Sequence, residues 1–376
     1  MLLPAPTYLP SRRANTIQVM KMAHALCALG EAVHLTIPDP YHQPPPDWES
    51  IAHQYGLAHR FKMTWLPVQA RWRSHDYAWQ VMRLAQREHV DWVYTRHPQA
   101  AALCSLVGIS TILEVHDLPQ GYFGPLWFRT FLAGSGARAL AVITRALKDA
   151  LPIQRWQKST IILPDGVDLA RFSDLPSPPA ARAALNLPQG FTAGYTGHLY
   201  AGRGVEMILQ LARRLPEMNF LLAGGNPEDV AHLKAQTAGL ENIIFTGFIP
   251  NADLPRYQAA CDVLMMPYQL QVSASSGGDI GRFLSPMKVF EYMACGRVIL
   301  SSDLPVLREV LHAGNALLLP PQDVDAWEHT LRAVQQTPRA YTALCRQARQ
   351  DAARYTWESR AYRLRAYAGT VSGDLP

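Results

Sequence analysis

Short runs of β-favouring residues alternate with stretches of helical periodicity along both halves of this chain. Such alternation is typical of parallel sheets covered by helices, because parallel strands need a crossover connection that is usually a helix. A helix is expected over Thr16–Leu29, where apolar residues recur every three or four positions and Gly30 provides a C-terminal cap. The expected strands are Val33–Ile37, Trp92–Thr95, Ile112–Val115, Ala141–Ile143 and Ile161–Leu163, then Thr192–Thr196, Phe220–Ala223, Ile243–Thr246, Val263–Met266, Val298–Leu300 and Ala316–Leu319. The pattern predicts an α/β protein with two parallel sheets.

The length of 376 residues suits about two domains of ordinary size. Ser173–Ala181 is rich in proline and serine and has no apolar period, so we place the linker there. We expect a first domain over residues 1–172 and a second over residues 173–355. The C-terminal helix, within about 356–376, is expected to cross back onto the first domain. Two open sheets of this kind would place a ligand at the carboxyl ends of their strands, in the cleft between the domains.

Composition excludes several classes of protein. Hydrophobic residues make up 48% and charged residues 17%, which provides enough apolar material for two cores and excludes wholesale disorder. No apolar run reaches the ~18 residues of a membrane-spanning helix, and no basic segment followed by an apolar one begins the chain. The five cysteines are widely spaced without a Cys-x-x-Cys pair, which argues against a zinc site or a disulfide framework. We expect a cytoplasmic protein.

Basic charge is concentrated in the first half of the sequence. Up to Phe172 there are 17 Lys and Arg against 12 Asp and Glu, whereas 18 oppose 18 afterwards. Many of the basic residues adjoin aromatic ones, and the segment from Pro44 to Trp79 carries four tryptophans, Trp48, Trp65, Trp72 and Trp79. Basic and aromatic side chains together suit the headgroup boundary of an anionic membrane. We therefore predict peripheral membrane contact, the alternative being that these aromatic residues belong to the core.

A glycine-rich turn stands between an expected strand and an expected helix. It runs from Gly197 to Gly204, follows the strand Thr192–Thr196 directly and precedes a helix that begins near Val205. Free backbone amides and the positive end of a helix dipole make such a turn a site for anions, and Arg203 adds a fixed cation. We interpret it as a cradle for a diphosphate, the alternative being an ordinary turn with a surface arginine.

A second candidate segment, SPMKVFEYMACG, runs from Ser285 to Gly296. Ser285 can cap a helix that has Pro286 in its first turn. Lys288 and Glu291 are three residues apart and share a face near the start of that helix. The lysine can meet a phosphate, and the glutamate can accept hydrogen bonds from a ribose diol. The alternative is a solvated Lys–Glu pair on a core helix.

The third candidate, Glu114–Asp117 (EVHD), stands at the end of a first-half strand and therefore at the expected ligand site. A histidine at position 116 could hold a substrate hydroxyl or move a proton. The alternative is that His116 is a structural histidine.

Taken in order, these segments resemble the family-4 glycosyltransferases of the GT-B fold, and the resemblance covers nearly the whole chain. Its pieces are Ala28–Gly30, Glu114–Asp117, Pro164–Asp168 with Phe172, Gly197–Gly204, Phe220–Gly225, Phe245–Ile249, Ala260–Pro267, Lys288–Gly296, Arg308-Glu309 before Gly314-Asn315, and Thr356–Glu358. The segment Ser285–Tyr292 is similar to a Ser-Pro-x-Lys-x-Phe-Glu-Tyr variant found in some branches of the family. Each piece alone is weak evidence, whereas the ordered set is specific.

The resemblance implies two Rossmann-like domains that face each other across a deep cleft. It implies a retaining hexosyltransferase (EC 2.4.1 class) that takes a nucleotide diphosphate sugar in the second domain and an acceptor in the first. Neither a metal nor another cofactor is expected, and nucleic acid is not an expected partner. Family frequency favours UDP over GDP or ADP, and the expected acceptor is a glycolipid or a saccharide.

The resemblance also implies functional residues. His116, Arg203 and Lys288 are the implied catalytic residues. The implied donor-binding residues are Gly197, His198, Arg203, Gly204, Gly224, Phe248, Ile249, Asp279, Ser285, Lys288 and Glu291. The implied acceptor-side residues are Asn15, Thr16, His116 and Asp117.

Two departures from the family pattern affect these expectations. Phe283 stands where the family has a glutamate that holds sugar hydroxyls, so the loop Ser275–Asp279 is expected to supply amides and a carboxylate instead. The N-terminal residues Met1–Leu3 are little of the usual first strand, so either that strand is stunted or the chain begins late. Two alternatives stay open, namely a sugar-nucleotide epimerase of the same fold and a non-catalytic GT-B partner subunit.

Overall fold

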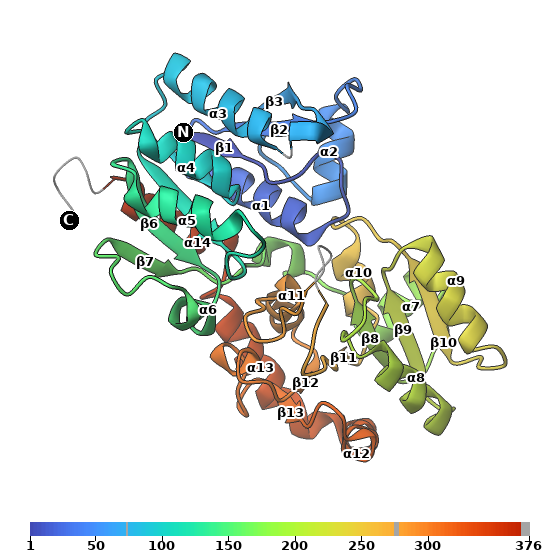
Figure 1. Cartoon of the computed structure of the whole chain (residues 1–376). Coiled ribbons are helices and arrows are strands. Elements are labelled where there is room, and N and C mark those ends of the chain that lie inside the picture. The colour runs from blue at the N-terminus through green and yellow to red at the C-terminus, as the bar shows by residue number, and fades with distance from the viewer. Residues whose placement is uncertain (73, 274–277, 370–376) are drawn as a thin grey trace. The chain divides into compact units, whose positions relative to one another are not determined.

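The computed structural model describes residues 1–72, 74–273 and 278–369. The chain forms two compact units, each built around its own parallel sheet (Figure 1). Unit 1 comprises Met1–Asp165 and the C-terminal segment from Trp357, and unit 2 comprises Gly166–Thr356. None of the helices within the described residues is long and apolar enough to cross a membrane.

The sheet of unit 1 has seven parallel strands. Their spatial order is β3 (Lys62–Pro67), β2 (His34–Asp39), β1 (Leu2–Pro4), β4 (Val93–Thr95), β5 (Thr111–Val115), β6 (Ala137–Val142) and β7 (Ser159–Ile162). The sequence order of the strands reverses between β1 and β4. In an open sheet, such a switch point places the strand ends on either side of a natural ligand site.

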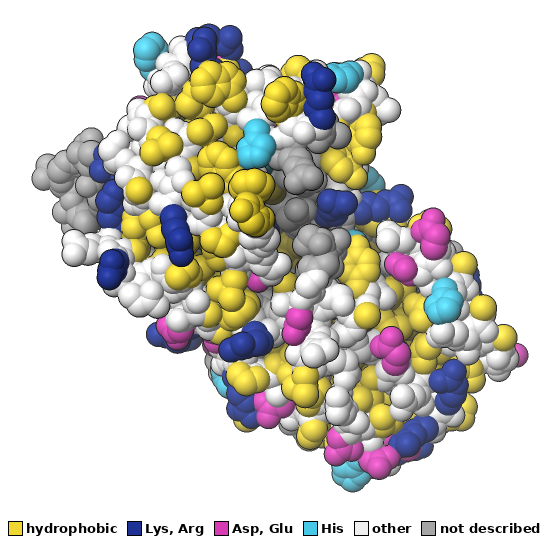
Figure 2. All heavy atoms as spheres, viewed as in Figure 1, with side chains coloured by type: hydrophobic (Ala, Val, Ile, Leu, Met, Phe, Trp, Pro, Cys, Tyr) yellow, Lys and Arg dark blue, Asp and Glu magenta, His cyan; other side chains and the backbone are white. Residues whose placement is uncertain are grey.

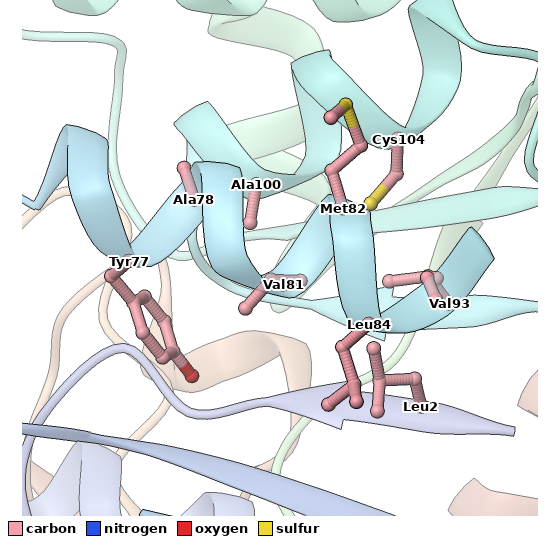
Figure 3. Packing of buried hydrophobic residues seen from close by; sticks show 10 residues of the cluster. Leu2, Tyr77, Ala78, Val81, Met82, Leu84, Val93, Ala100 and Cys104 are labelled. Carbon is pink, nitrogen blue, oxygen red and sulfur yellow. The ribbon is translucent and has the colours of Figure 1, made fainter. Parts of the chain in front are cut away.

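Helices cover both faces of this sheet (Figure 1). On one face α3 (His75–Arg87), α4 (Pro98–Leu106) and α5 (Gly124–Ala133) pack side by side, and on the other α1 (Ala14–Ala28) packs against α14 (Trp357–Gly369). The short helices α2 (Trp48–Tyr55) and α6 (Arg145–Ala150) complete the unit. Figure 3 shows the core under α3 and α4, whose cluster includes Val81 and Leu84 of α3, Ala100 and Cys104 of α4, Leu2 of β1 and Val93 of β4.

The first strand is short but central, as its burial shows. Leu2 and Leu3 are buried, and β1 pairs with β2 on one side and β4 on the other.

The sequence pattern does not predict β3, because most of its side chains are partly exposed and give no apolar run. The segment from Pro44 to Trp79, which has no clear pattern in sequence, thus contains α2, an edge strand and the start of α3.

Unit 2 has a six-stranded parallel sheet of the same topology. Its spatial order is β10 (Ile243–Gly247), β9 (Asn219–Ala223), β8 (Thr192–Thr196), β11 (Val263–Met266), β12 (Val298–Ser302) and β13 (Leu317–Leu319). The order reverses between β8 and β11, so the glycine-rich turn after β8 lies at the switch point. All six strands expected from sequence in this half are present.

Two groups of helices pack around the sheet of unit 2. In the first group, α8 (Val205–Arg214) packs against α12 (Val324–Gln336), and α9 (Pro227–Gln236) lies on β10. In the second, α7 (Pro178–Ala184), α10 (Leu254–Ala259), α11 (Met287–Cys295) and α13 (Thr342–Ala352) contact one another in a row.

The boundary between the units lies after Asp165, before the expected linker at Ser173–Ala181. Phe172 is buried, and its carbonyl oxygen accepts a hydrogen bond from Arg349. The prolines that suggest a linker open α7, where a missing backbone donor costs nothing. Arg182 of α7 then binds the carbonyl oxygen of Ala260, which fixes this segment within unit 2.

Candidate functional site

The turn after β8 is closely packed against neighbouring backbone. Gly197, Gly202 and Gly204 all have positive φ values. A Cβ atom on Gly204 would lie 1.8 Å from the carbonyl oxygen of Pro267, and one on Gly202 would lie 2.0 Å from that of Gln271. The turn therefore lies directly on the chain that leaves β11, at the switch point of the sheet.

The start of α8 adds first-turn backbone amides to this turn. Gly204 is the N-cap residue, and it offers no side chain to cap the first-turn amides. These amides and the positive end of the helix dipole favour an anion.

Two cations converge beside the turn. The ammonium nitrogen of Lys288, on α11, lies 3.6 Å from the centre of the Tyr195 ring and 5.4 Å from that of Tyr268. Arg203 lies over the Tyr268 ring and donates a hydrogen bond of 2.9 Å to its hydroxyl. Both Nζ of Lys288 and Nε of Arg203 are buried without a hydrogen-bond partner among the described residues. Buried donors of this kind need an acceptor, so the site favours an anionic ligand.

Burial and the neighbouring charge change the protonation of Lys288. Loss of hydration, together with the positive charge of Arg203, lowers the pKa of Lys288 well below its ordinary value, and Glu291 opposes the shift only in part. Negative charge bound between the two cations would reverse this effect.

Glu291 lies on the same helix and is held from a third element. Gln258 of α10 donates a hydrogen bond of 3.0 Å to Glu291 Oε2 and another, of 3.3 Å, to the hydroxyl of Thr196 at the end of β8. Glu291 itself is partly exposed. Its carboxylate is thus positioned at the carboxyl end of β8 and can accept hydrogen bonds from a diol.

Several other predicted donor-side residues also lie around the switch point. Gly224 follows β9 and packs on Gly197, since a Cβ there would lie 2.2 Å from the Gly197 carbonyl oxygen. The His198 ring stacks on Tyr200, and its carbonyl oxygen accepts a hydrogen bond from the Tyr195 hydroxyl. Phe248 and Ile249 follow β10 and are partly exposed.

One expectation about this part of the site needs correction, and the structure adds a local role for Asp279. Ser285 does not cap α11, because the helix begins at Met287 with Pro286 as its N-cap residue and no side-chain cap. Asp279 uses its Oδ1 atom to accept hydrogen bonds from the amides of Val272 and Gly281, so this carboxylate oxygen braces its own loop. Ser275, Ser276 and Gly277 lie outside the described residues. Phe283 is buried, which accounts for an apolar residue at that position.

Unit 1 contains a second cluster of ionisable side chains. One ligand atom from each of Glu114, His116 and Asp165 lies within 4.8 Å of the others. His116 Nε2 makes a very short hydrogen bond with Glu114 Oε1, and Arg360 of α14 lies 2.9 Å from that oxygen. Gln18 of α1 donates a hydrogen bond of 2.7 Å to the same oxygen. The cluster joins the ends of β5 and β7 to two helices on one face of the sheet.

Two guanidinium groups balance the two carboxyl groups of the cluster. Arg96, which follows β4, donates a hydrogen bond of 3.1 Å to the amide oxygen of Gln18. Burial raises the pKa of Glu114 and of Asp165, and Arg360 opposes both shifts. Burial, reinforced by the charge of Arg96, lowers the pKa of His116 well below its ordinary value. His116 is therefore neutral near pH 7.

The remaining acceptor-side residues adjoin members of the cluster along the chain. Thr16 is buried and Asn15 partly exposed in the first turn of α1, which also carries Gln18. Asp117 accepts hydrogen bonds from the Leu118 amide and the Gln120 side chain, as a turn-forming residue does.

Sequence reasoning misses Arg360, Gln18 and Asp165 as members of the His116 cluster. Arg360 is remote from the rest of the cluster in sequence, and its hydrogen bond to Tyr94 joins residues that are 266 positions apart. No spacing within a single sequence reveals such a contact. Asp165 offers a weak signal, because it stands directly after a proline and shortly after the end of a strand.

Comparisons with known proteins agree with this architecture. Residues 190–336 match the family described as "Glycosyl transferases group 1". Phosphatidyl-myo-inositol mannosyltransferase of Mycolicibacterium smegmatis is 26% identical over 237 residues, which cover 58% of this chain and 55% of that protein. The chain spans about half or less of the length of the curated relatives it matches.

Solved structures are similar over nearly the entire chain. Sucrose-phosphate synthase of Thermosynechococcus elongatus has a TM-score of 0.76 at 17% identity, covering 98% of both chains. Anabaena HepE in complex with UDP-glucose has a TM-score of 0.74 at 15% identity, covering 99% of both chains. The expected fold class is confirmed, and this chain has the GT-B fold of two Rossmann-like domains.

Proposed function

We propose that this protein is a retaining hexosyltransferase that uses a nucleotide diphosphate sugar. The observation that carries the proposal is a pair of cations, Lys288 and Arg203, beside a glycine-rich turn at the switch point of unit 2; each has a buried donor atom with no partner among the described residues. A diphosphate satisfies both cations and the first-turn amides of α8 at once. Glu291, held by Gln258, is suited to the ribose.

The same groups suit the chemistry of the leaving group. When the bond between the anomeric carbon and the diphosphate breaks, negative charge grows on the diphosphate oxygens. Fixed cations and amides that are already in place stabilise this charge without having to reorganise. In the proposed reaction the acceptor oxygen forms a bond to the anomeric carbon as the bond to the diphosphate breaks. Lys288 and Arg203 neutralise the departing diphosphate, and His116 of unit 1 takes up the proton of the acceptor hydroxyl.

UDP is the proposed nucleotide, ahead of GDP and ADP. The choice is supported by family frequency and by Anabaena HepE, which was solved with UDP-glucose. No cofactor is proposed. One cluster does contain side chains of the types that bind metal ions, namely Glu114, His116 and Asp165. However, three hydrogen-bonding groups already converge on one oxygen of Glu114. Two guanidinium groups thus supply the charge that a metal ion would bring.

The function is tested by release of nucleotide diphosphate in the presence of EDTA. We expect UDP to be released from UDP-hexose at a rate that increases at least tenfold when acceptor is added, because transfer needs both substrates. Calorimetric titration with UDP, GDP and ADP should show the tightest binding for UDP. Sugar-nucleotide epimerisation without acceptor would instead identify an epimerase, and absence of turnover despite UDP binding would identify a partner subunit. Tighter binding of GDP or ADP would overturn the choice of nucleotide.

We further propose that the acceptor is a glycolipid or lipid-linked saccharide met at an anionic membrane surface. Of the four tryptophans between Pro44 and Trp79, Trp72 and Trp79 are more than half exposed, whereas Trp48 packs on Phe61. The structure adds exposed residues that sequence does not indicate, because Tyr122, Phe123 and Leu126 project from α5 and the turn before it. These five exposed residues, Trp72, Trp79, Tyr122, Phe123 and Leu126, are here called the aromatic face.

The charge around the aromatic face suits an anionic surface. The contact between the His75 and Trp127 rings joins α3 to α5 on this side of unit 1. Exposed Arg71, Arg83 and Arg129 adjoin the face, and the sequence from Leu118 to Lys148 contains no Asp or Glu. Figure 2 shows hydrophobic side chains over α3 to α5 of unit 1 with few acidic ones among them. Each basic residue near such a surface contributes about 1 kcal/mol.

Sedimentation with lipid vesicles tests the membrane proposal. At low salt we expect the protein to pellet with vesicles that contain anionic lipid, and at least tenfold less with neutral ones, because the arginines supply much of the attraction. A triple variant with Tyr122, Phe123 and Leu126 replaced by serine should lose most of this binding. Tyr362→Ser on α14 removes an exposed ring from the other side of the sheet and is the matched control. Absence of wild-type pelleting would favour a soluble acceptor.

A further inference from the structure

The side chains around Glu114 determine which of its two protonation states is present. Oε1 of Glu114 faces three groups: the Gln18 amide at 2.7 Å, the Arg360 guanidinium at 2.9 Å and Nε2 of His116. A guanidinium can only donate a hydrogen bond. An oxygen that receives several donors suits an ionised carboxylate better than a carboxylic acid.

The orientation of Gln18 supports the ionised state. Its amide oxygen accepts a hydrogen bond of 3.1 Å from Arg96 Nη1, so its amide nitrogen must be the atom that faces Glu114. Arg96 therefore acts on Glu114 through Gln18, and Arg360 acts on it directly. Both guanidinium groups favour the ionised carboxylate.

Arg360 is fixed by contacts that leave its guanidinium little freedom. Its Nε donates to the Pro164 carbonyl oxygen, Nη1 to the Tyr94 hydroxyl and Nη2 to the Leu163 carbonyl oxygen. Those two carbonyls directly precede Asp165, the other carboxyl group of the cluster. A single arginine on the C-terminal helix thus positions both acidic residues around His116.

We propose that Arg360 is a positioning residue that locks His116 as the neutral tautomer with its proton on Nε2. With Glu114 ionised, His116 Nε2 donates to it, and a neutral imidazole then has Nδ1 as an acceptor. Glu114 and Arg360 are fully or almost fully buried, whereas the His116 side chain is 19% exposed. His116 is therefore the member of the cluster that a substrate can reach, and it reaches that substrate as a hydrogen-bond acceptor.

Loss of the Arg360 charge has a definite chemical consequence. A buried carboxylate without its cation takes up a proton from solvent, and the resulting Glu114 carboxylic acid donates that proton in its hydrogen bond to His116 Nε2. The imidazole proton then moves to Nδ1 by exchange with solvent, so Nδ1 becomes a donor. The histidine would keep its place and lose its acceptor atom.

The tautomer can be measured without turnover, by NMR of protein with ¹⁵N-labelled histidine at pH 7. The His116 signals are identified by their loss in His116→Gln. In the wild type we expect a protonated Nε2 and an unprotonated Nδ1. Arg360→Met and Arg360→Gln should exchange the two, whereas Arg360→Lys, which keeps a cation, should preserve the wild-type tautomer. Arg360→Gln retains hydrogen-bond donors, and it serves as the second variant if Arg360→Met does not fold.

Two results would overturn the proposal. One is a wild-type His116 that is charged or protonated on Nδ1. The other is a folded Arg360→Met or Arg360→Gln variant that keeps the wild-type tautomer. The catalytic meaning of the tautomer rests on the proposed function. If that function holds, both neutral variants should lose roughly 100-fold in kcat, as for loss of a general base, while UDP binding stays within about twofold. Absence of wild-type turnover would reject the function and leave the tautomer measurement standing.

Discussion

Lys288→Met and Arg203→Met should each lower the kcat of sugar transfer by roughly 100- to 1000-fold, which is about 3–4 kcal/mol of lost transition-state stabilisation. Each variant removes a cation that has one buried donor atom, Nζ of Lys288 or Nε of Arg203, without a hydrogen-bond partner among the described residues. The loss should be larger in kcat than in donor affinity, since the charge on the diphosphate grows as the bond breaks. Steady-state kinetics with saturating donor measure the effect.

Lys234→Met is the matched control, because Lys234 is exposed on α9 of the same unit and its replacement should leave kcat unchanged.

A calorimetric comparison tests whether the charge of Lys288 binds the diphosphate. The pKa of free Lys288 is lowered by burial and by Arg203, and a bound diphosphate raises it, so UDP binding takes up protons at a pH between the two values. Wild-type affinity should therefore fall more steeply with rising pH than that of Lys288→Met, in which only the ligand titrates. Near-normal turnover of both cation variants would contradict the proposed transferase.

The strand pattern predicts the fold because buried parallel strands leave a strong signal. Val263–Met266 is apolar at every position, fully buried and predicted with its observed bounds. The edge strand Lys62–Pro67 is not predicted. Most of its side chains are partly exposed, and polar and apolar residues are mixed along it, so the strand has no continuous apolar run. The proline-rich segment near Pro178 is predicted as a linker but begins the helix α7. Proline interrupts a helix in its interior and is also common in its first turn, so the sequence alone does not separate the two cases.

The candidate site likewise contains some residues that the sequence identifies and others that it does not. Arg203, Lys288 and Glu291 are identifiable because each lies in a short local motif whose spacing carries the chemistry. Tyr195 and Tyr268, whose rings receive the Lys288 ammonium group, look like core residues in sequence because they are buried at the ends of strands. Arg360 carries no local signal, since its role exists only after α14 has packed on unit 1.

The second large effect concerns Gly204, where alanine should destabilise unit 2 by roughly 3–5 kcal/mol. Two costs add at this position. The backbone has φ +79, which a residue with a Cβ adopts at a cost, and the new atom would lie 1.8 Å from the carbonyl oxygen of Pro267. A backbone oxygen cannot swing aside as a side chain can, so the turn must separate from the chain after β11.

Gly239→Ala isolates the contact from the backbone strain. Gly239 has a similar φ of +89 in the same unit, yet a Cβ atom there would meet nothing within 4 Å. This control should cost only about 1 kcal/mol. Thermal unfolding followed by circular dichroism should therefore show a midpoint roughly 10 °C lower for Gly204→Ala and only a few degrees lower for Gly239→Ala. Because separation of the turn also moves Arg203 and the first-turn amides, Gly204→Ala should lose UDP binding while Gly239→Ala keeps it. Equal midpoints for the two variants would show that the turn is not held by its contact with Pro267, and the packed anion cradle would then be wrong.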